Sequence, residues 1–142
     1  MTSTAPPPSA PIVAEHRMTI RSYLPAHDAQ AARLQSLTYL ATIGWAGPSG
    51  LAVSTIDQLV RNASQFGRCS GGEIGLRIAR TEADDLLIDV VDHNPEFPSF
   101  EEAVSGLLGQ GLWRVADYGA AVSWHPHEGG KTVRAVLPGA RS

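Results

Sequence analysis

Two polar side chains, Gln58 and Asn62, lie four residues apart in a segment whose apolar residues have helical spacing. Residues at this spacing project from the same side of a helix, here beside the apolar stripe rather than within it. The amide oxygen of Asn62 is the kind of ligand that a hard cation such as Mg²⁺ prefers. A solvated helix face is the simpler interpretation, so Asn62 alone does not establish a metal site.

A carboxylate, Asp92, ends an apolar segment that has the composition of a strand. Period-two counting places it on the same face as Leu86, Ile88 and Val90. A carboxylate on the core face of a sheet needs a partner, and the amino group of a ligand would be one. A turn-forming aspartate before Asn94-Pro95 explains the residue equally well.

Glycines stand directly before a predicted helix in the segment Gly109-Gln110-Gly111-Leu112. Glycines allow close approach of backbone amides, and the start of a helix favours phosphate; a flexible turn is the alternative. The dinucleotide-binding glycine pattern fails because Arg114 occupies its third glycine position. Gly130-Lys131-Thr132 matches the end of a P-loop, but it lacks the earlier glycine and enters a strand instead of a helix.

Two further candidates are weaker. His125 and His127, with Glu128, could chelate a metal, but no further ligand falls at the required spacing. Cys69 lies in a Gly/Ser-rich loop without an obvious base, which predicts a free thiol.

The first half of the chain predicts one strand and two helices. Alternation indicates a strand over about 17–24, which Pro25 ends. Asp28 is a plausible cap for a helix over about 28–44. Ser49 caps a second helix that runs to Phe66. The expected apolar stripes of the two helices are Ala31, Leu34, Leu37, Leu40 and Ala41, and then Ile56, Leu59, Val60, Ala63 and Phe66.

The second half predicts two hairpins around a helix. Strands over 74–79 and 86–92 are separated by a polar turn. A loop from Pro95, a helix over 110–119 and a final pair of strands, 122–124 and 132–137, follow. Because the order is β-α-α-β-β-α-β-β, we expect an α+β, two-layer α/β sandwich, with a mixed, mostly antiparallel sheet and helices on one face.

Length and composition limit the possible functions. The chain has 142 residues, 43% of them hydrophobic and 18% charged, which indicates one globular domain over 16–138. Residues 1–15 read as a disordered Pro/Ser/Ala-rich leader and 139–142 as a tail. The net charge of −3 argues against a duplex nucleic-acid binder. A single cysteine excludes an internal disulfide, and no apolar run reaches membrane-helix length. Only one of the 11 basic residues is lysine, and Ala, Gly and Pro are abundant, a composition typical of high-GC coding, so we expect a bacterial cytoplasmic protein.

Taken together, four segments occur in a suggestive order: Leu59–Ala63, Asp92–Pro95, Gly109–Leu112 and Gly130–Val133. In this order they resemble the ATP-binding module shared by histidine kinases, Hsp90, gyrase and the MutL proteins, with its Bergerat-type fold. The pattern looks closest to the stand-alone anti-sigma factors, which are serine kinases that control sigma factors by partner switching. The resemblance covers about residues 16–138.

The resemblance implies a role for residues at each end of a nucleotide. At the base end, Asp92 matches the carboxylate that accepts the adenine amino group, with Asn94 in the same motif. Thr132 matches the threonine that supports the adenine through Asp92 or a water molecule.

At the phosphate end, Asn62 matches the asparagine that holds Mg²⁺ against the phosphates. Gly109 and Gly111, with the amides leading into Leu112, match the glycine box that cradles phosphate. The loop over 95–108 matches the lid above the nucleotide.

The departure from the branch that bears on catalysis is at position 58. Its members usually carry a glutamate four residues before the asparagine, where it serves as the general base toward the target serine. Here that position is Gln58, whose neutral amide cannot accept the serine proton. Asp57 is adjacent in sequence but points about 100° away around the helix.

Two functions therefore stay open. The first is an ATP- and Mg²⁺-binding anti-sigma-type regulator with protein serine kinase activity toward a small antagonist protein. The alternative is a catalytically impaired nucleotide-binding module that still switches partners. Both imply a sigma factor and an antagonist protein as partners, without direct contact with nucleic acid or membrane. Both are also compatible with a homodimer. An acyl-CoA-dependent N-acetyltransferase is disfavoured because Gly106 stands where its pattern has Arg or Gln.

Overall fold

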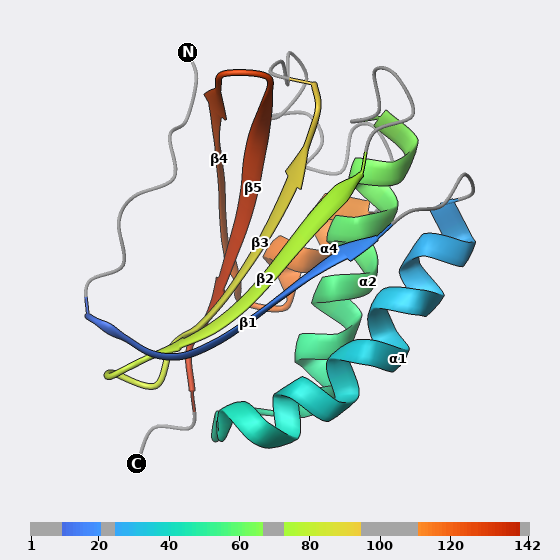
Figure 1. The fold of residues 1–142 in the computed structure, drawn as a ribbon. Helices are drawn as coiled ribbons and strands as arrows, with labels where there is room; N and C mark the ends of the chain where they lie inside the picture. The colour runs from blue at the N-terminus through green and yellow to red at the C-terminus, as the bar shows by residue number, and fades with distance from the viewer. Residues whose placement is uncertain (1–9, 21–24, 67–72, 95–110, 140–142) are drawn as a thin grey trace.

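The computed structural model describes residues 10–20, 25–66, 73–94 and 111–139. Figure 1 shows the described helices packed against one side of the sheet. The elements, in chain order, are β1 (Ile12–Ile20), α1 (Pro25–Ile43), α2 (Ser49–Phe66), β2 (Ile74–Thr81), β3 (Leu86–Asp92), α4 (Gly111–Asp117), β4 (Ala121–His127) and β5 (Gly130–Leu137).

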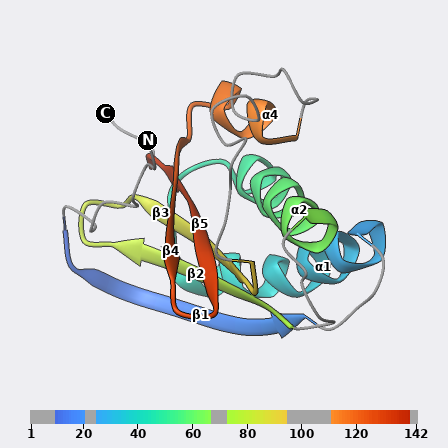
Figure 2. The ribbon, with the colours of Figure 1, turned by 90° about the horizontal axis from the view of Figure 1, so that it is seen from above.

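The sheet has five strands in the order β1-β2-β3-β5-β4, and every neighbouring pair is antiparallel. Seen from above, α1, α2 and α4 all lie over the same face (Figure 2). The predicted two-layer α+β sandwich is confirmed. Because each hairpin strand alternates its side chains between the helical layer and the open face, register decides which residues can reach the site.

The sheet begins earlier than predicted. β1 starts at Ile12, within the segment expected to be a leader, and pairs with β2 from Ile12↔Thr81 to Ile20↔Ile74. Burial alternates along the whole strand, with the even-numbered residues toward the helices. The Pro/Ser/Ala-rich composition before Ile12 concealed this alternation. Residues 21–24, the predicted end of the strand, lie outside the described residues.

The first helix differs from the prediction in its start. α1 begins at Pro25 rather than at 28, which suits proline because the first turn needs no backbone N–H partner. Asp28 is not its cap: the side chain is buried in the first turn and accepts a hydrogen bond from Ser64 of α2.

The buried face of α1 also differs from the predicted stripe. Leu34 and Leu37 are 62% and 53% exposed. Small residues, Ala29, Ala32 and Ser36, are fully buried instead, and allow α1 to lie close against α2. Only Leu40 of the predicted stripe belongs to the core.

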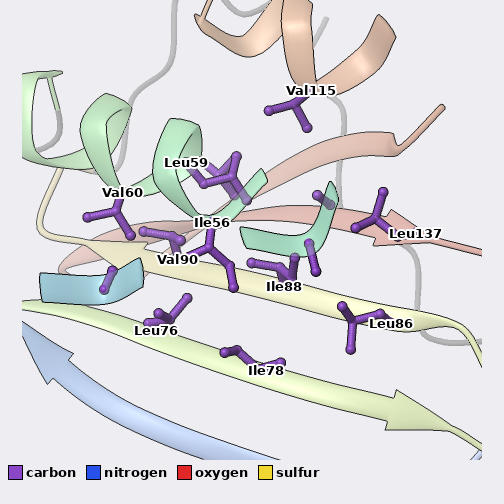
Figure 3. Close-up of a cluster of buried hydrophobic side chains, with 14 of the residues drawn as sticks. Ile56, Leu59, Val60, Leu76, Ile78, Leu86, Ile88, Val90, Val115 and Leu137 are labelled. Atoms are coloured by element: carbon purple, nitrogen blue, oxygen red, sulfur yellow. The ribbon is translucent and has the colours of Figure 1, made fainter. Parts of the chain in front are cut away.

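The core lies between α2 and the central strands (Figure 3). The predicted stripe of α2 is confirmed at Ile56, Leu59, Val60 and Ala63, all at most 1% exposed. The side chains packed around it are Leu76 and Ile78 of β2, Leu86, Ile88 and Val90 of β3, Val115 of α4 and Leu137 of β5. This packing holds β3 beside α2. Among the described residues, no helix has the length and apolar character needed to cross a membrane.

Candidate functional site

Asp92 is the last residue of β3 and shares the helix-facing side with Ile88 and Val90. It is 2% exposed. Its Oδ1 accepts the backbone N–H of Asn94 at 2.9 Å, so Asp92 does form the turn that the sequence allowed. The turn and the inner position predicted for this carboxylate are therefore both present.

A second group, the ammonium of Lys131, closes on the same carboxylate. Lys131 Nζ lies 3.1 Å from Asp92 Oδ1 and 3.0 Å from Oδ2, and also donates to the backbone oxygen of Asn94 at 3.1 Å. Lys131 is itself 2% exposed. A carboxylate and an ammonium that are buried together compensate each other's charge, whereas either group buried alone would leave an uncompensated charge.

Burial dominates the acid–base behaviour of Asp92. Desolvation raises the pKa of Asp92 above its ordinary value, and the Asn94 N–H and the Lys131 ammonium oppose that rise. The nearby His93 also favours the ionised form.

A glycine fixes the approach of β5 to this point. A Cβ on Gly130 would lie 1.9 Å from the backbone oxygen of Asp92 and 3.0 Å from its carbonyl carbon. Since both are backbone atoms, only glycine lets β5 begin beside the end of β3. Gly130 thus permits the close strand approach at which Lys131 contacts Asp92.

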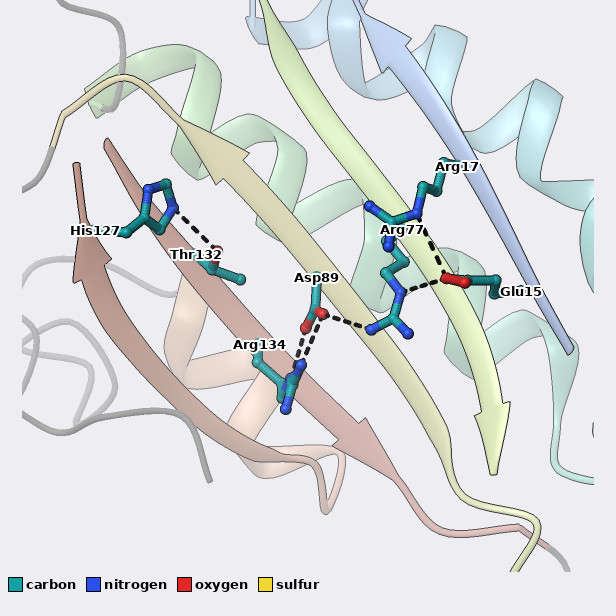
Figure 4. A network of polar contacts seen from close by, with 7 residues as sticks. All are labelled: Glu15, Arg17, Arg77, Asp89, His127, Thr132 and Arg134. Carbon is teal, nitrogen blue, oxygen red and sulfur yellow. Dashed lines mark hydrogen bonds and ion pairs between the residues drawn. The ribbon is translucent and has the colours of Figure 1, made fainter. Parts of the chain in front are cut away.

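Thr132 does not occupy the place expected from the resemblance. It pairs with Val91, while Asp92 pairs with Lys131, so the side chain of Thr132 lies on the opposite face of the sheet. Its Oγ1 lies 3.3 Å from Nε2 of His127 (Figure 4). Thr132 therefore does not contact Asp92, and Lys131 lies there instead. Period-two counting back from the apolar Leu137 and Ala135 would have indicated this.

Gln58 and Asn62 lie on α2, whose packed neighbours include β3 and α4. Both side chains are half-buried, at the edge of the core as predicted. Asn62 therefore retains an amide oxygen of the type suited to Mg²⁺ on the helix beside β3.

Asp57, the adjacent carboxylate, is engaged elsewhere. It is 8% exposed and pairs with Arg33 of α1 and, at 2.9 Å, with Arg61 one turn along α2. It therefore faces the α1 side of the helix. The carboxylate of Asp57 is therefore engaged by two arginines rather than free beside Gln58.

The phosphate end is described only in part. α4 begins at Gly111, close to the predicted start at 110, and ends at Asp117 instead of 119. Val115 of α4 is fully buried against the core. Gly109 and the expected lid over 95–108 lie outside the described residues, and of Gly111 and Leu112 only the helical backbone is described.

The open face of the sheet carries a charged row that the sequence did not suggest (Figure 4). Arg134 binds Asp89 through two hydrogen bonds of 2.7 and 2.9 Å. Arg77 joins Asp89 at 3.3 Å to Glu15 at 2.6 Å. The Arg77 hydrogen bond lowers the pKa of Glu15 below its ordinary value.

The histidine pair does not build a metal centre. The rings of His125 and His127 are 6.0 Å apart. Within the described ranges, no group of three or more His, Cys, Asp or Glu side chains is placed to hold a metal ion.

Comparisons with known proteins reveal the fold. The chain is similar to a crystal structure of the RsbU and RsbW domains of Rv1364c from Mycobacterium tuberculosis, with a TM-score of 0.61 and 19% identity over 92% of this chain. It is also similar to a histidine kinase domain from the blue-light-activated histidine kinase of Erythrobacter litoralis EL346, with a TM-score of 0.51 and 15% identity over 81% of this chain. No family model and no curated protein matches the chain.

The chain spans 34% of the first of these structures and 61% of the second. Its fold is therefore similar to that of these two solved domains. At these identities the similarity concerns the fold, and the residues of the site have to be judged individually.

Proposed function

We propose that this chain is an ATP-binding regulatory module of the anti-sigma factor kind. The observation that carries the proposal is the buried Asp92 at the end of β3, in a sheet with this fold and beside the helix that bears Asn62. In this proposal Asp92 and Asn94 lie at the base end, and the backbone of Gly109, Gly111 and Leu112 lies at the phosphate end.

The residues fit ATP and Mg²⁺ in part. Asn62 offers a half-buried amide oxygen, an appropriate ligand for Mg²⁺. Asp92 offers a carboxylate, which suits an amino group, although Lys131 already lies on it. When bound, Mg-ATP would supply the phosphoryl group, and this chain's residues would orient the base and the metal.

The proposal extends to regulation by partner switching in the cytoplasm. The first solved structure carries RsbU and RsbW domains in one chain. Together with the fold, this supports a sigma factor and an antagonist protein as partners, held without direct contact to DNA. A pull-down with candidate partners, in the presence and in the absence of Mg-ATP, tests this extension. If no candidate binds in either condition, the extension is contradicted.

Phosphotransfer to a serine depends on a general base. A serine that attacks the terminal phosphate must give its proton to a base. Gln58 cannot accept it, and Asp57 is held by two arginines. This pairing favours the second candidate, a nucleotide-binding switch module without kinase activity.

Gln58→Glu separates the two candidates. With labelled ATP and an antagonist protein, activity of the wild type would contradict the module without kinase activity. Activity gained only in Gln58→Glu would contradict the active kinase. Gln30→Glu, at an exposed position on α1, is the matched charge control.

Calorimetric titration with Mg-ATP tests nucleotide binding itself. We expect saturable binding that Asp92→Asn weakens by about tenfold or more, because a hydrogen bond to a charged acceptor is lost. Glu82→Gln removes an exposed carboxylate at the other end of the β2–β3 hairpin and is the control. Equal affinities of Asp92→Asn and the control would contradict the assignment of Asp92.

A further inference from the structure

Lys131 is the only lysine of the chain, and it is almost completely buried. Its ammonium has three oxygens within 3.1 Å: both carboxylate oxygens of Asp92 and the backbone oxygen of Asn94. A long, flexible, charged side chain is rarely buried in this way unless it is paired. Its place is therefore set by the contact with Asp92.

The backbone reinforces this placement. Lys131 pairs directly with Asp92 in the β3–β5 register, so the two side chains project from the same face of the sheet. Gly130 then brings β5 so near that a single added carbon would overlap the backbone of Asp92. The ammonium is held at Asp92 by the fold as well as by charge.

The consequence concerns the atom that a nucleotide base would need. A neutral amino group binds Asp92 by donating to a carboxylate oxygen. Oδ1 already accepts a hydrogen bond from Lys131 Nζ at 3.1 Å. The same Nζ lies 3.0 Å from Oδ2, which is buried and accepts no hydrogen bond from the described residues. Removing the ammonium from a buried carboxylate is costly, since it leaves an uncompensated charge.

We propose that Lys131 is a specificity-determining residue of the nucleotide site: its ammonium occupies the place of the base's exocyclic amino group, so Lys131 and an adenine base compete for Asp92. The inference rests on the proposed ATP-binding function and adds a built-in competitor to it. The contrary possibility, that Lys131 only neutralises Asp92, predicts that removing the lysine leaves nucleotide affinity unchanged or weakened.

Lys131→Thr and Lys131→Gln test the competition by calorimetric titration. We expect Lys131→Thr to bind Mg-ATP about tenfold or more tightly than the wild type. Lys131→Gln should lie between them, because its amide still donates to Asp92 without a charge. Inosine triphosphate, which carries a keto group in place of the amino group, is the matched control ligand. Its affinity should increase far less than that of ATP when Lys131 is replaced.

An unchanged or weaker affinity for ATP in both variants would overturn the proposed competition. An equal increase in affinity for inosine triphosphate would also overturn it. Circular dichroism and thermal melting establish that each variant is folded. If neither the folded wild type nor a folded variant binds ATP, the proposed function itself fails. ATP binding by the wild type without a gain in the variants removes only the role of Lys131.

A measurement on the wild type does not depend on how the variants fold. Because Lys131 is the only lysine, ¹⁵N-lysine labelling gives a single side-chain ammonium signal. We expect saturating Mg-ATP to shift this signal as the ammonium leaves Asp92, and inosine triphosphate to shift it less. A signal that saturating ATP leaves in place would overturn the proposal.

Discussion

Gly130→Ala is expected to force the start of β5 away from the end of β3. The new Cβ would have to retreat from 1.9 Å to at least 3.4 Å from the backbone oxygen of Asp92. No side chain can rotate to relieve this overlap, because the atoms in contact are the backbone of Asp92 and His93. The strands must therefore separate where Lys131 meets Asp92.

The cost follows from that displacement. Overpacking a well-packed site costs about 1–3 kcal/mol. We expect about 3 kcal/mol or more here, because the movement also loosens a buried ion pair. Urea unfolding should show a lower midpoint with an unchanged slope.

Gly75→Ala is the matched control on the neighbouring hairpin. A Cβ there meets only the Cβ of Val91, at an ordinary 3.6 Å. It should leave the free energy of unfolding unchanged or slightly raised. A Gly130→Ala variant that unfolds within about 0.5 kcal/mol of the wild type, the usual range for a harmless substitution, would refute the close approach.

Three further predictions concern residues away from the site. Because the Arg77 hydrogen bond lowers the pKa of Glu15, the ionised Glu15 stabilises the fold above its ordinary pKa of 4.5 and loses that contribution as the pH falls through the lowered pKa. Glu15→Gln should therefore reduce the difference between the urea midpoints measured at pH 7 and at pH 3. An unchanged difference would contradict this contribution of Glu15. Arg134→Met should destabilise the chain by about 3 kcal/mol in urea, because it strips Asp89 of its bidentate partner, and a double variant with Asp89→Leu should recover much of the loss; additive losses would contradict this. Leu34→Gln should change the free energy of unfolding by less than about 0.5 kcal/mol, whereas Leu40→Ala should cost about 2 kcal/mol or more. A comparably large cost for Leu34→Gln would restore the predicted stripe.

The fold was predictable because its signals are local. Period-two alternation in β2 and β3 and the apolar stripe of α2 each lie within one segment, and each predicted the correct element and buried face. α1 misled because it carries apolar residues on more than one side. Its contact with α2 selected the small residues, which spacing within one helix does not reveal.

The site was predictable at Asp92 and not at its partner. Asp92 and Lys131 lie 39 residues apart, so their contact depends on the register of β5 against β3. The Gly130-Lys131-Thr132 segment resembles the end of a phosphate-binding loop and favours Thr132 as the functional residue. The alternation of the strand instead assigns Lys131 to the inner face. The charged row of Glu15, Arg77 and Arg134 was missed for the same reason, since it joins residues from separate strands.

The two carboxylates nearest to the proposed chemistry share one property: each is already paired with a cation of the same chain. Asp57 pairs with Arg33 and Arg61, and Asp92 pairs with Lys131. The core that defines the fold, built on Ile56 and its neighbours, does not depend on either carboxylate being available to a ligand. The fold can therefore persist while the chemistry changes, so similarity of fold at 19% identity does not by itself assign the chemistry of the site.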